Sequence, residues 1–367
     1  MTEAAIFPAP RASALGALAP RAEAAIIPVA ALLCGFLAFS VFLLALGKSP
    51  VDFFALVWKA GFSSAFSWQN TLSRVPPLLL AALCVALPAR LGLVVIGGEG
   101  AIVLGGLAAA ATGLAVSGAP AIIGFACMVA AACIAGGVWI GAVGALRFKR
   151  GVNETIASLL MAYIAIALLN HLVEGPLRDA ASLNKPSTAP LPAALRVGDM
   201  PLDISVHWGL VFGVILCILA WVLIERTTIG FAARIAGGNV RAAQVQGLPV
   251  GRLIIGFTAL GGACAGLAGF FEVAAIHGSA NGSLVSGYGY TGILVAFLAR
   301  HNPLAIIPVA IMLAGFEASS GLIQRRMDLP DAAVLVLEGM VFVVILLSET
   351  MYGRLRIFSP SYWAPKA

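Results

Sequence analysis

The chain has 367 residues, of which 61% are hydrophobic and 10% charged, with a formal net charge of +6 and a mean hydropathy of +1.02. Soluble domains do not reach this composition, so the sequence predicts an all-α polytopic membrane protein. No segment is polar and long enough to form a separate catalytic domain. The positive charge is spread over loops, which indicates membrane topology and not nucleic-acid binding.

Ten stretches approach the ~20 apolar residues that a membrane-spanning helix needs. They are residues 25–47, 71–88, 91–115, 120–146, 153–173, 206–224, 253–275, 287–300, 303–323 and 331–349. With the N-terminus inside, 14 of the 22 Lys and Arg residues fall in cytoplasmic segments and the other eight outside. The positive-inside rule therefore predicts that both termini are cytoplasmic. Arg325 and Arg326 run against this orientation, with Asp328 and Asp331 nearby.

This topology divides the chain into a transmembrane domain and two tails. The predicted parts are a cytoplasmic N-terminal tail (1–24), the transmembrane domain (25–349), a periplasmic loop (174–205), a cytoplasmic loop (225–252) and a cytoplasmic C-terminal tail (350–367). Residues 50–68 are expected to lie at the membrane interface. Small residues recur every four positions at Gly137 and Gly141 and at Gly261, Ala265 and Gly269, a pattern that predicts closely packed helices.

The cytoplasmic loop predicts a short helix with its own start and stop. Asn239 is a good N-cap for a helix over 240–246, Gly247 fits the position after its end, and Pro249 prevents its continuation. A two-turn helix is not stable alone in water, so we expect it to rest on another element. A basic helical loop of this kind could dock a soluble motor, or it could be an ordinary cytoplasmic loop.

Acidic residues inside the apolar spans are candidates for the solute pathway, because burying a charge in a bilayer is costly. Glu99 lies among three glycines, which favours a broken helix that lines a polar cavity, or a carboxylate that caps a helix end. Glu272, Glu317 and Glu338 each lie within a predicted span, where a structural role is the alternative.

Polar and aromatic residues near the spans are weaker candidates. Asn153 and Glu154 begin the fifth span, where an Asn N-cap followed by Glu is also ordinary helix chemistry. Aromatic residues in membranes more often serve packing, but four of them could stack on a flat ring: Tyr163, Tyr288, Tyr290 and Phe271.

Two glycine-containing motifs do not predict nucleotide binding. The GxGxxG run from Gly287 to Gly292 has no strand before it and no acid ~20 residues after it. Gly47-Lys48-Ser49 lacks the upstream glycine of a phosphate-binding loop. The histidines and cysteines show no metal-ligand or catalytic constellation, so we predict no cofactor, no metal and no enzymatic activity in this chain.

The cytoplasmic loop resembles the motor-docking loop of permease subunits from bacterial ATP-binding-cassette (ABC) importers, in the branch for ribose, branched-chain amino acids and nucleosides. The matching positions are Thr228, Gly230, Arg234, Gly237, Asn239, Ala242, Ala243 and Gly247. Three further segments, from Val94, Gly151 and Gly287, resemble nucleoside-type permeases. Three positions depart from that group, since Val95, Ala101 and Ala162 stand where it usually has polar side chains.

The resemblance implies a permease subunit in a bacterial inner membrane that forms the pathway for a small polar solute, most simply a nucleoside. It implies a separate ATPase subunit, a second related permease chain or a second copy, and an extracytoplasmic binding protein. The same architecture with a sugar such as ribose is one alternative. A secondary transporter driven by an ion gradient, with Glu99, Glu317 or Glu338 carrying protons, is another. A channel is a third.

Overall fold

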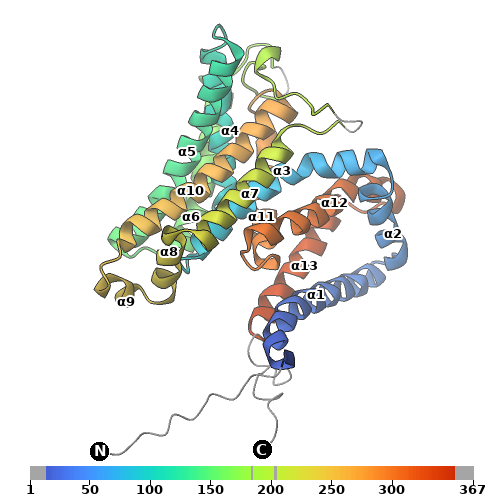
Figure 1. The fold of residues 1–367 in the computed structure, drawn as a ribbon. Coiled ribbons are helices and arrows are strands. Elements are labelled where there is room, and N and C mark those ends of the chain that lie inside the picture. Colours follow the sequence, from blue (N-terminus) through green and yellow to red (C-terminus); the bar gives the residue numbers. More distant parts are fainter. Residues whose placement is uncertain (1–13, 183–184, 202–204, 352–367) are drawn as a thin grey trace, which may run out of the picture. The chain divides into compact units, whose positions relative to one another are not determined.

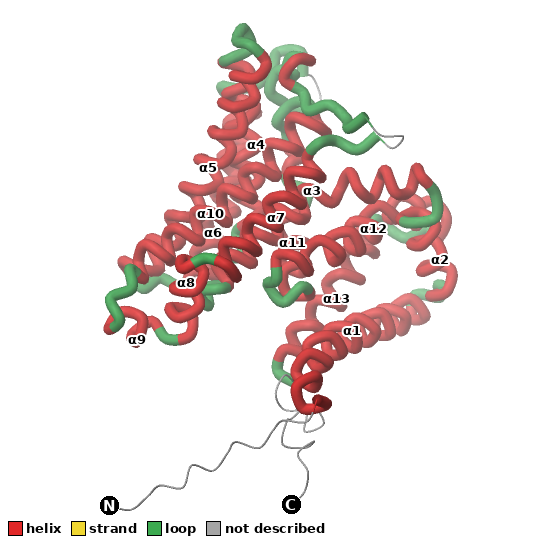
Figure 2. Tube along the Cα trace, in the orientation of Figure 1, coloured by secondary structure: helices red, strands yellow, loops and turns green. Residues whose placement is uncertain are grey.

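The computed structural model describes residues 14–182, 185–201 and 205–351 as helices joined by loops (Figures 1 and 2). The described residues form no β-strand, only two isolated bridges. The chain divides into two compact units, residues 1–51 with 331–367 (unit 1) and residues 52–330 (unit 2). Residues 1–13 and 352–367 of the two predicted tails lie outside the described residues.

In unit 1, α1 (Ala14–Ala45) packs against α13 (Ala332–Glu349). The two backbones come close because Gly35 has no side chain: a Cβ there would lie 2.9 Å from the Cα of Val341. Glu338 is 5% exposed in this unit.

Unit 2 holds most of the helices. In chain order they are α2 (Pro50–Gly61), which straddles the boundary, α3 (Ala65–Ala89), α4 (Gly98–Ala115), α5 (Ala121–Arg150), α6 (Glu154–Glu174), α7 (Gly209–Arg226), α8 (Thr228–Gly238), α9 (Val240–Val245), α10 (Val250–Phe271), α11 (Tyr288–Leu298) and α12 (Pro303–Met327). Within the described residues, nine helices are long and apolar enough to cross a membrane. The predicted all-α polytopic class is confirmed.

The eighth predicted span, 287–300, is wrong as a full-length helix. In its place α11 has 11 residues, or about 17 Å, roughly half the thickness of a bilayer core. The stretch before α11 is irregular and bonds to the loop between α6 and α7, through Leu191 N–H to Gly278 O and Thr188 N–H to Ala280 O. Irregular backbone at membrane depth is tolerated where protein buries it. Residues 278–302 thus connect the two ends of unit 2 with a loop followed by a short helix.

Three helix starts also differ from the prediction. α1 begins at Ala14 and not at 25, within the predicted N-terminal tail. α3 begins at Ala65 and not at 71, so Arg74 lies in its third turn and not at its start. α4 begins at Gly98 and not at 91, and residues 91–97 are non-helical. The helix is therefore interrupted at the glycines around Glu99, as the sequence indicates.

The centre of unit 2 is a set of glycine contacts between α10 and its neighbours α4 and α5, which we call the glycine seam. A Cβ on Gly266 would overlap the carbonyl oxygen of Ala132, and one on Gly269 would overlap that of Ile102. Gly262 likewise lies against Gly136. The close packing predicted from the small-residue pattern is confirmed, and it leaves no space for a side chain at these positions.

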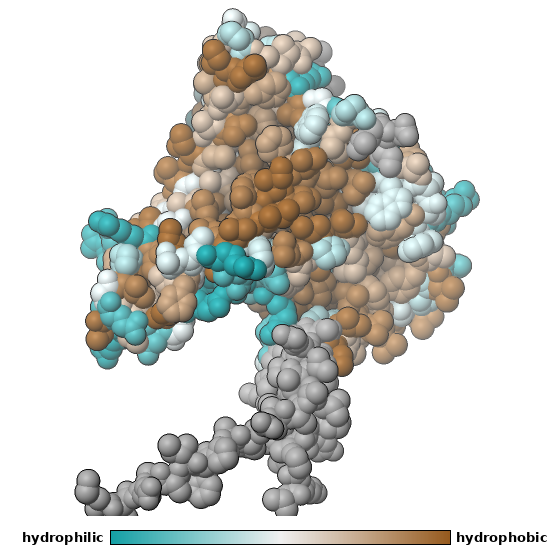
Figure 3. All heavy atoms as spheres, viewed as in Figure 1, coloured by the Kyte–Doolittle hydropathy of each residue, from teal (hydrophilic) through white to brown (hydrophobic). Residues whose placement is uncertain are grey.

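The surface of unit 2 matches a membrane protein. On the face drawn in Figure 3, hydrophobic residues cover the helices between the two ends, and hydrophilic residues gather over α8 and α9. We call this the α9 end of unit 2. The opposite end carries the loop between α6 and α7, where Figure 2 shows long non-helical segments.

Candidate functional site

Glu99 joins two short helices inside unit 2. It lies in the first turn of α4, fully buried, and its carboxylate accepts hydrogen bonds from the backbone of α11. Gly287 N–H donates to Oε1 at 2.8 Å, and Gly289 N–H donates to Oε2 at 2.6 Å. A carboxylate at a helix N-terminus satisfies orphan N–H groups and is stabilised by the helix dipole. Of the two roles weighed from the sequence, the structure places Glu99 as a cap, on a helix other than its own.

Around α11 the structure brings together further polar side chains, which we call the α11 cluster. Arg74 of α3 hydrogen-bonds the hydroxyl of Tyr288 and lies close to Glu317 of α12. Thr291 of α11 hydrogen-bonds Glu317. The Nε of Arg74 is buried without a hydrogen-bond partner. A buried cation next to acids at membrane depth is costly unless it is paired, which makes this cluster the functional candidate within unit 2.

The acid Glu272 lies near the same cluster, at the start of a π-helical turn (Glu272–His277) that ends α10. Its Oε2 is 3.4 Å from His277 Nε2, while its Oε1 is buried without a hydrogen-bond partner. π-helical turns within helices occur frequently at functional sites. Of the predicted pathway residues, Glu99, Glu272 and Glu317 are therefore brought together.

His207, just before α7, adds a neutral group to this region. Its Nδ1 accepts from Gly209 N–H at 3.2 Å, and its Nε2 lies 3.3 Å from the carbonyl oxygen of Ser73. Burial lowers the pKa of His207, against smaller opposing effects from its neighbours. A ring that accepts at one nitrogen and donates at the other is a neutral imidazole.

The other predicted pathway residues are not part of this buried group of acids. Tyr290 is 39% exposed on α11, near Glu99 and Tyr163, and Tyr163 is 59% exposed. Asn153 caps α6 by accepting from Ile156 N–H, and Glu154 pairs with Arg147 at 3.2 Å. Both belong to the junction between α5 and α6. Glu338 belongs to unit 1.

Arg74 and Thr291 were not among the predicted site residues, whereas Tyr288 was considered as an aromatic residue that could stack on a flat ring. Arg74 lies near the start of the predicted span 71–88, where a basic side chain can reach the membrane surface. The structure has α3 beginning at Ala65, with Ser64 as its N-cap, so Arg74 lies deeper in the helix.

The three departures from the nucleoside-type pattern do not face open space in this structure. Val95, Ala101 and Ala162 are each 0% exposed. Ala162 lies where α6 packs on α4, since a Cβ on Gly100 would lie 2.7 Å from its Cα. An apolar side chain fits a fully buried position at each of the three.

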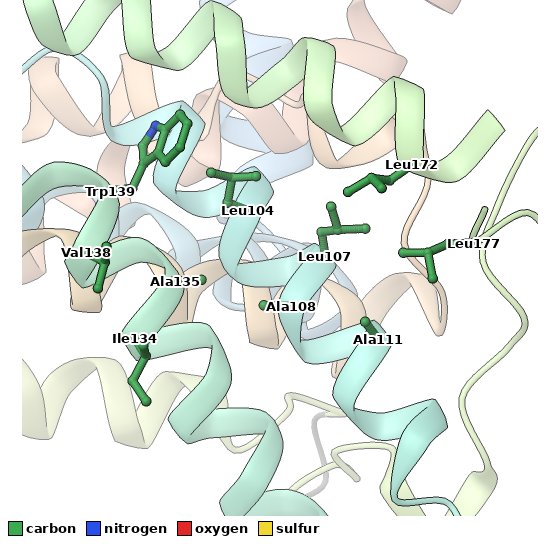
Figure 4. A pocket seen from close by; sticks show the side chains of 10 residues that line it. All are labelled: Leu104, Leu107, Ala108, Ala111, Ile134, Ala135, Val138, Trp139, Leu172 and Leu177. Atoms are coloured by element: carbon green, nitrogen blue, oxygen red, sulfur yellow. The ribbon is translucent and has the colours of Figure 1, made fainter. Parts of the chain in front are cut away.

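An apolar pocket of about 480 Å³ lies between α4, α5 and α6 (Figure 4). Its lining residues are Leu104, Leu107, Ala108, Ala111, Ile134, Ala135, Val138, Trp139, Leu172 and Leu177. The polar group among them, the Trp139 indole N–H, already donates to Met161 O at 3.2 Å. Such a pocket offers nothing to bind a polar solute.

The polar loop after α7 forms two helices. The sequence predicted one; the other, α8, is capped by Thr227, which accepts from Gly230 N–H at 3.1 Å. A Cβ on Gly230 would overlap the carbonyl of Ile224, so this glycine lets α8 fold back on the end of α7. Arg234 of α8 pairs with Glu225 at 2.6 Å.

The predicted helix of this loop is present as α9, from Val240 to Val245. Asn239 accepts from Ala242 N–H at 3.0 Å, which confirms the N-cap. Gly247 has a φ of +77°, a left-handed conformation that glycine adopts at little cost, as expected after the end of a helix. Ala243 is 0% exposed and faces the protein, so α9 rests on its neighbours as expected.

A bundle of membrane-length helices with a buried polar cluster and a capped helical loop at one end defines a membrane transport subunit. The sequence matches the family described as the branched-chain amino acid transport system / permease component, over residues 67–346. The chain belongs to this family of ABC transporter permeases.

Curated relatives cover nearly the whole chain. The glucose ABC transporter permease of Haloferax volcanii is 32% identical, over 90% of this chain and 89% of its own length. The guanosine ABC transporter permease of Bacillus subtilis is 27% identical, over 89% and 94%. The nucleoside ABC transporter permease of Lactococcus lactis is 22% identical, over 87% and 90%.

Family membership settles several expectations. The chain is a multi-pass subunit of the bacterial inner membrane and not itself an enzyme, since ATP hydrolysis lies in a separate ATPase subunit. A substrate-binding protein is the second partner that the family implies. Membership favours an ATP-driven importer over the ion-driven alternative.

Proposed function

We propose that this chain forms the translocation pathway of an ABC importer for a nucleoside. Two relatives carry names for guanosine and nucleosides, and the three apolar positions that argued against a nucleoside are fully buried. The observation that carries the pathway is the α11 cluster, where Arg74 and Glu272 keep buried polar atoms without partners. A solute with hydroxyl groups can accept from the first and donate to the second.

A sugar is the second candidate cargo. The relative with 32% identity is named for glucose, and a sugar offers the same hydroxyl groups as the ribose of a nucleoside. The nucleobase separates the two candidates, because a flat ring would use an aromatic contact such as Tyr290, which is partly exposed beside Glu99.

Residues 225–252 are proposed to dock the ATPase through α9, with a second related permease chain or a second copy completing the pathway. The segment lies at one end of unit 2. The predicted topology, in which both termini are cytoplasmic, places this end in the cytoplasm. Closure of the ATPase would push on α9 and tilt α7 and α10, which flank the loop and would switch the pathway between its two openings.

Labelled-solute uptake tests the cargo. An uptake-deficient host would express this chain with its ATPase and binding protein, and separately with an inactive ATPase. We expect uptake of a nucleoside that vanishes with the inactive ATPase. Uptake of glucose or ribose without uptake of any nucleoside would show that the cargo is a sugar and not a nucleoside. Nucleoside uptake that survives the inactive ATPase would contradict ATP-driven transport.

A proline pair tests the docking role of α9. Ala243→Pro removes the N–H that bonds to Asn239 O at 3.0 Å, so it breaks the helix and should abolish uptake. Val240→Pro is the matched control, because the first helical position tolerates proline and Asn239 already has extended geometry. Equal uptake by both variants, at equal amounts of inserted protein, would contradict the docking role.

A further inference from the structure

Four groups meet at the α9 end of unit 2, from four different parts of the chain. Glu225, in the last turn of α7, pairs with Arg234 of α8 at 2.6 Å and with Arg90, just after α3, at 3.6 Å. Arg90 also donates a hydrogen bond to the carbonyl oxygen of His301, between α11 and α12, at 3.2 Å. We call these groups the Arg90 clasp.

The clasp is directly joined to the loop that carries α9. Near the end of α8, a Cβ on Gly237 would overlap the carbonyl oxygen of Arg90, so the helix rests on the Arg90 backbone. α9 follows after Asn239. A displacement of α8 would therefore reach Arg90 by two routes. One is the contact of Gly237 with the Arg90 backbone, and the other is the pair of ion contacts from Arg234 to Glu225 and from Glu225 to Arg90.

The other side of the clasp is the end of α11. Arg300 and His301 have φ values of 51° and 55°, which are unfavourable for residues with side chains. His301 N–H bonds to Ala296 O, and its ring contacts Phe297 at 4.8 Å between centroids. Burial and the charges of Arg90 and Arg300 lower the pKa of His301 to about 4. The ring is neutral, and Arg90 contacts this turn through the backbone carbonyl.

At its other end, α11 holds Glu99 through Gly287 and Gly289, and it contributes Tyr288 and Thr291 to the α11 cluster. The helix is short and has polar contacts at both ends. A shift at the His301 end would be carried to the cap and the cluster, because α11 is a continuous helix of 11 residues between them.

We propose that the Arg90 clasp transmits movement of the ATPase-docking loop to α11, so that Arg90 and Glu225 are positioning residues for energy coupling. In this role the pair of Arg90 and Glu225 links the loop to the α11 cluster. This inference rests on the proposed docking role of residues 225–252.

The test uses the purified complex with its ATPase and binding protein in liposomes, and measures solute moved per ATP hydrolysed. Glu225→Gln removes the charge and keeps the shape of the side chain. We expect transport per ATP to fall roughly tenfold while ATP hydrolysis continues, the size of a typical coupling between sites. Arg226→Gln is the matched control, because Arg226 is in the same turn but stacks on Trp221.

A second pair guards against a variant that fails to assemble. Arg90→Gln should lower transport per ATP, and Arg90→Lys, which keeps the charge, should restore part of it. Arg90→Gln combined with Glu225→Gln should cost less than the sum of the two single changes, because both remove the Arg90–Glu225 pair. Unchanged transport per ATP in assembled Glu225→Gln and Arg90→Gln complexes would overturn the clasp.

The two proposals fail in different ways. If Ala243→Pro leaves uptake normal, the docking role is wrong, and the clasp has no input to transmit. If Ala243→Pro abolishes uptake while the clasp variants keep normal transport per ATP, the docking role stands and the clasp is wrong.

Discussion

The glycine seam and α11 both hold helices together in lipid, but with different balances of contacts. The seam uses backbone contact without charge, and its helices are long: α5 has 30 residues and α10 has 22. α11 has 11 residues and combines glycine contacts, Gly289 on α4 and Gly292 on α3, with hydrogen bonds to side chains of α3, α4 and α12. Close packing permits one arrangement, whereas polar contacts can be exchanged for others. We therefore expect the seam to be the more rigid of the two, and α11 to be the element whose polar contacts can change.

The seam should be broken by a single added side chain, and the loss should exceed that from removing any polar contact of α11. Gly269→Val would push a branched side chain into the backbone of α4, and we expect almost no folded protein. Gly256→Val, on the same helix with open space at its Cβ, should fold normally. The measurement is the yield of monodisperse protein in detergent. A normal yield of Gly269→Val would mean that the seam is not rigid.

Removing the cap of α11 should cost less than breaking the seam. Glu99→Ala leaves the N–H groups of Gly287 and Gly289 unpaired, a loss of about 3 kcal/mol or more for charge-assisted hydrogen bonds. We expect folded protein with a lower thermal midpoint and little uptake. Glu154→Ala is the control, because its partner Arg147 is 43% exposed and such pairs contribute at most about 1 kcal/mol. Equal thermal midpoints for the two variants would contradict a special role of the cap.

Neutralising Arg74 alone and together with Glu317 should show whether Arg74 contacts the solute or serves only as the structural partner of Glu317. Arg74→Gln alone leaves Glu317 without its neighbouring cation, which is destabilising. Arg74→Gln with Glu317→Gln restores charge balance, so stability should recover. We expect the KM for uptake to stay raised roughly tenfold in the double variant, the loss of about one good hydrogen bond. A KM that recovers with stability would assign Arg74 a structural role alone.

The smallest expected effect is a pH dependence at the α11–α12 turn. His301 has a pKa of about 4 in the folded protein and 6.5 ordinarily, so the unfolded chain binds its proton first as the pH falls. The contribution of neutral His301 to the free energy of unfolding is fully present above pH 6.5 and is lost as the pH falls from 6.5 to 4. At pH 5 the loss is roughly 2 kcal/mol. His301→Gln should flatten the fall in thermal midpoint between pH 7 and 5. The same fall in both proteins would exclude His301 as its source.

The sequence predicted the parts of the fold that local patterns control. Asn239 and Gly247 signalled α9 because caps act within one turn, and the small-residue pattern signalled the seam because it repeats along one helix face. The sequence did not reveal that Glu99 caps a helix formed by residues 288–298, since no local pattern records a partner so far along the chain. Arg74 was missed for the same reason, because its neighbours Tyr288 and Glu317 lie more than 200 positions along the chain.

The hydrogen bonds of Glu99 join residues 188 and 190 positions apart. At synthesis rates of roughly 5–20 residues per second, the ribosome needs on the order of 10–40 s to make the chain between them. During that time Glu99 enters the membrane before its partners exist. The order of translation thus leaves the Glu99 carboxylate without its two hydrogen-bond donors in the half-made protein. α11 can pack against Glu99 only after the seam helices α4, α5 and α10 have been synthesised.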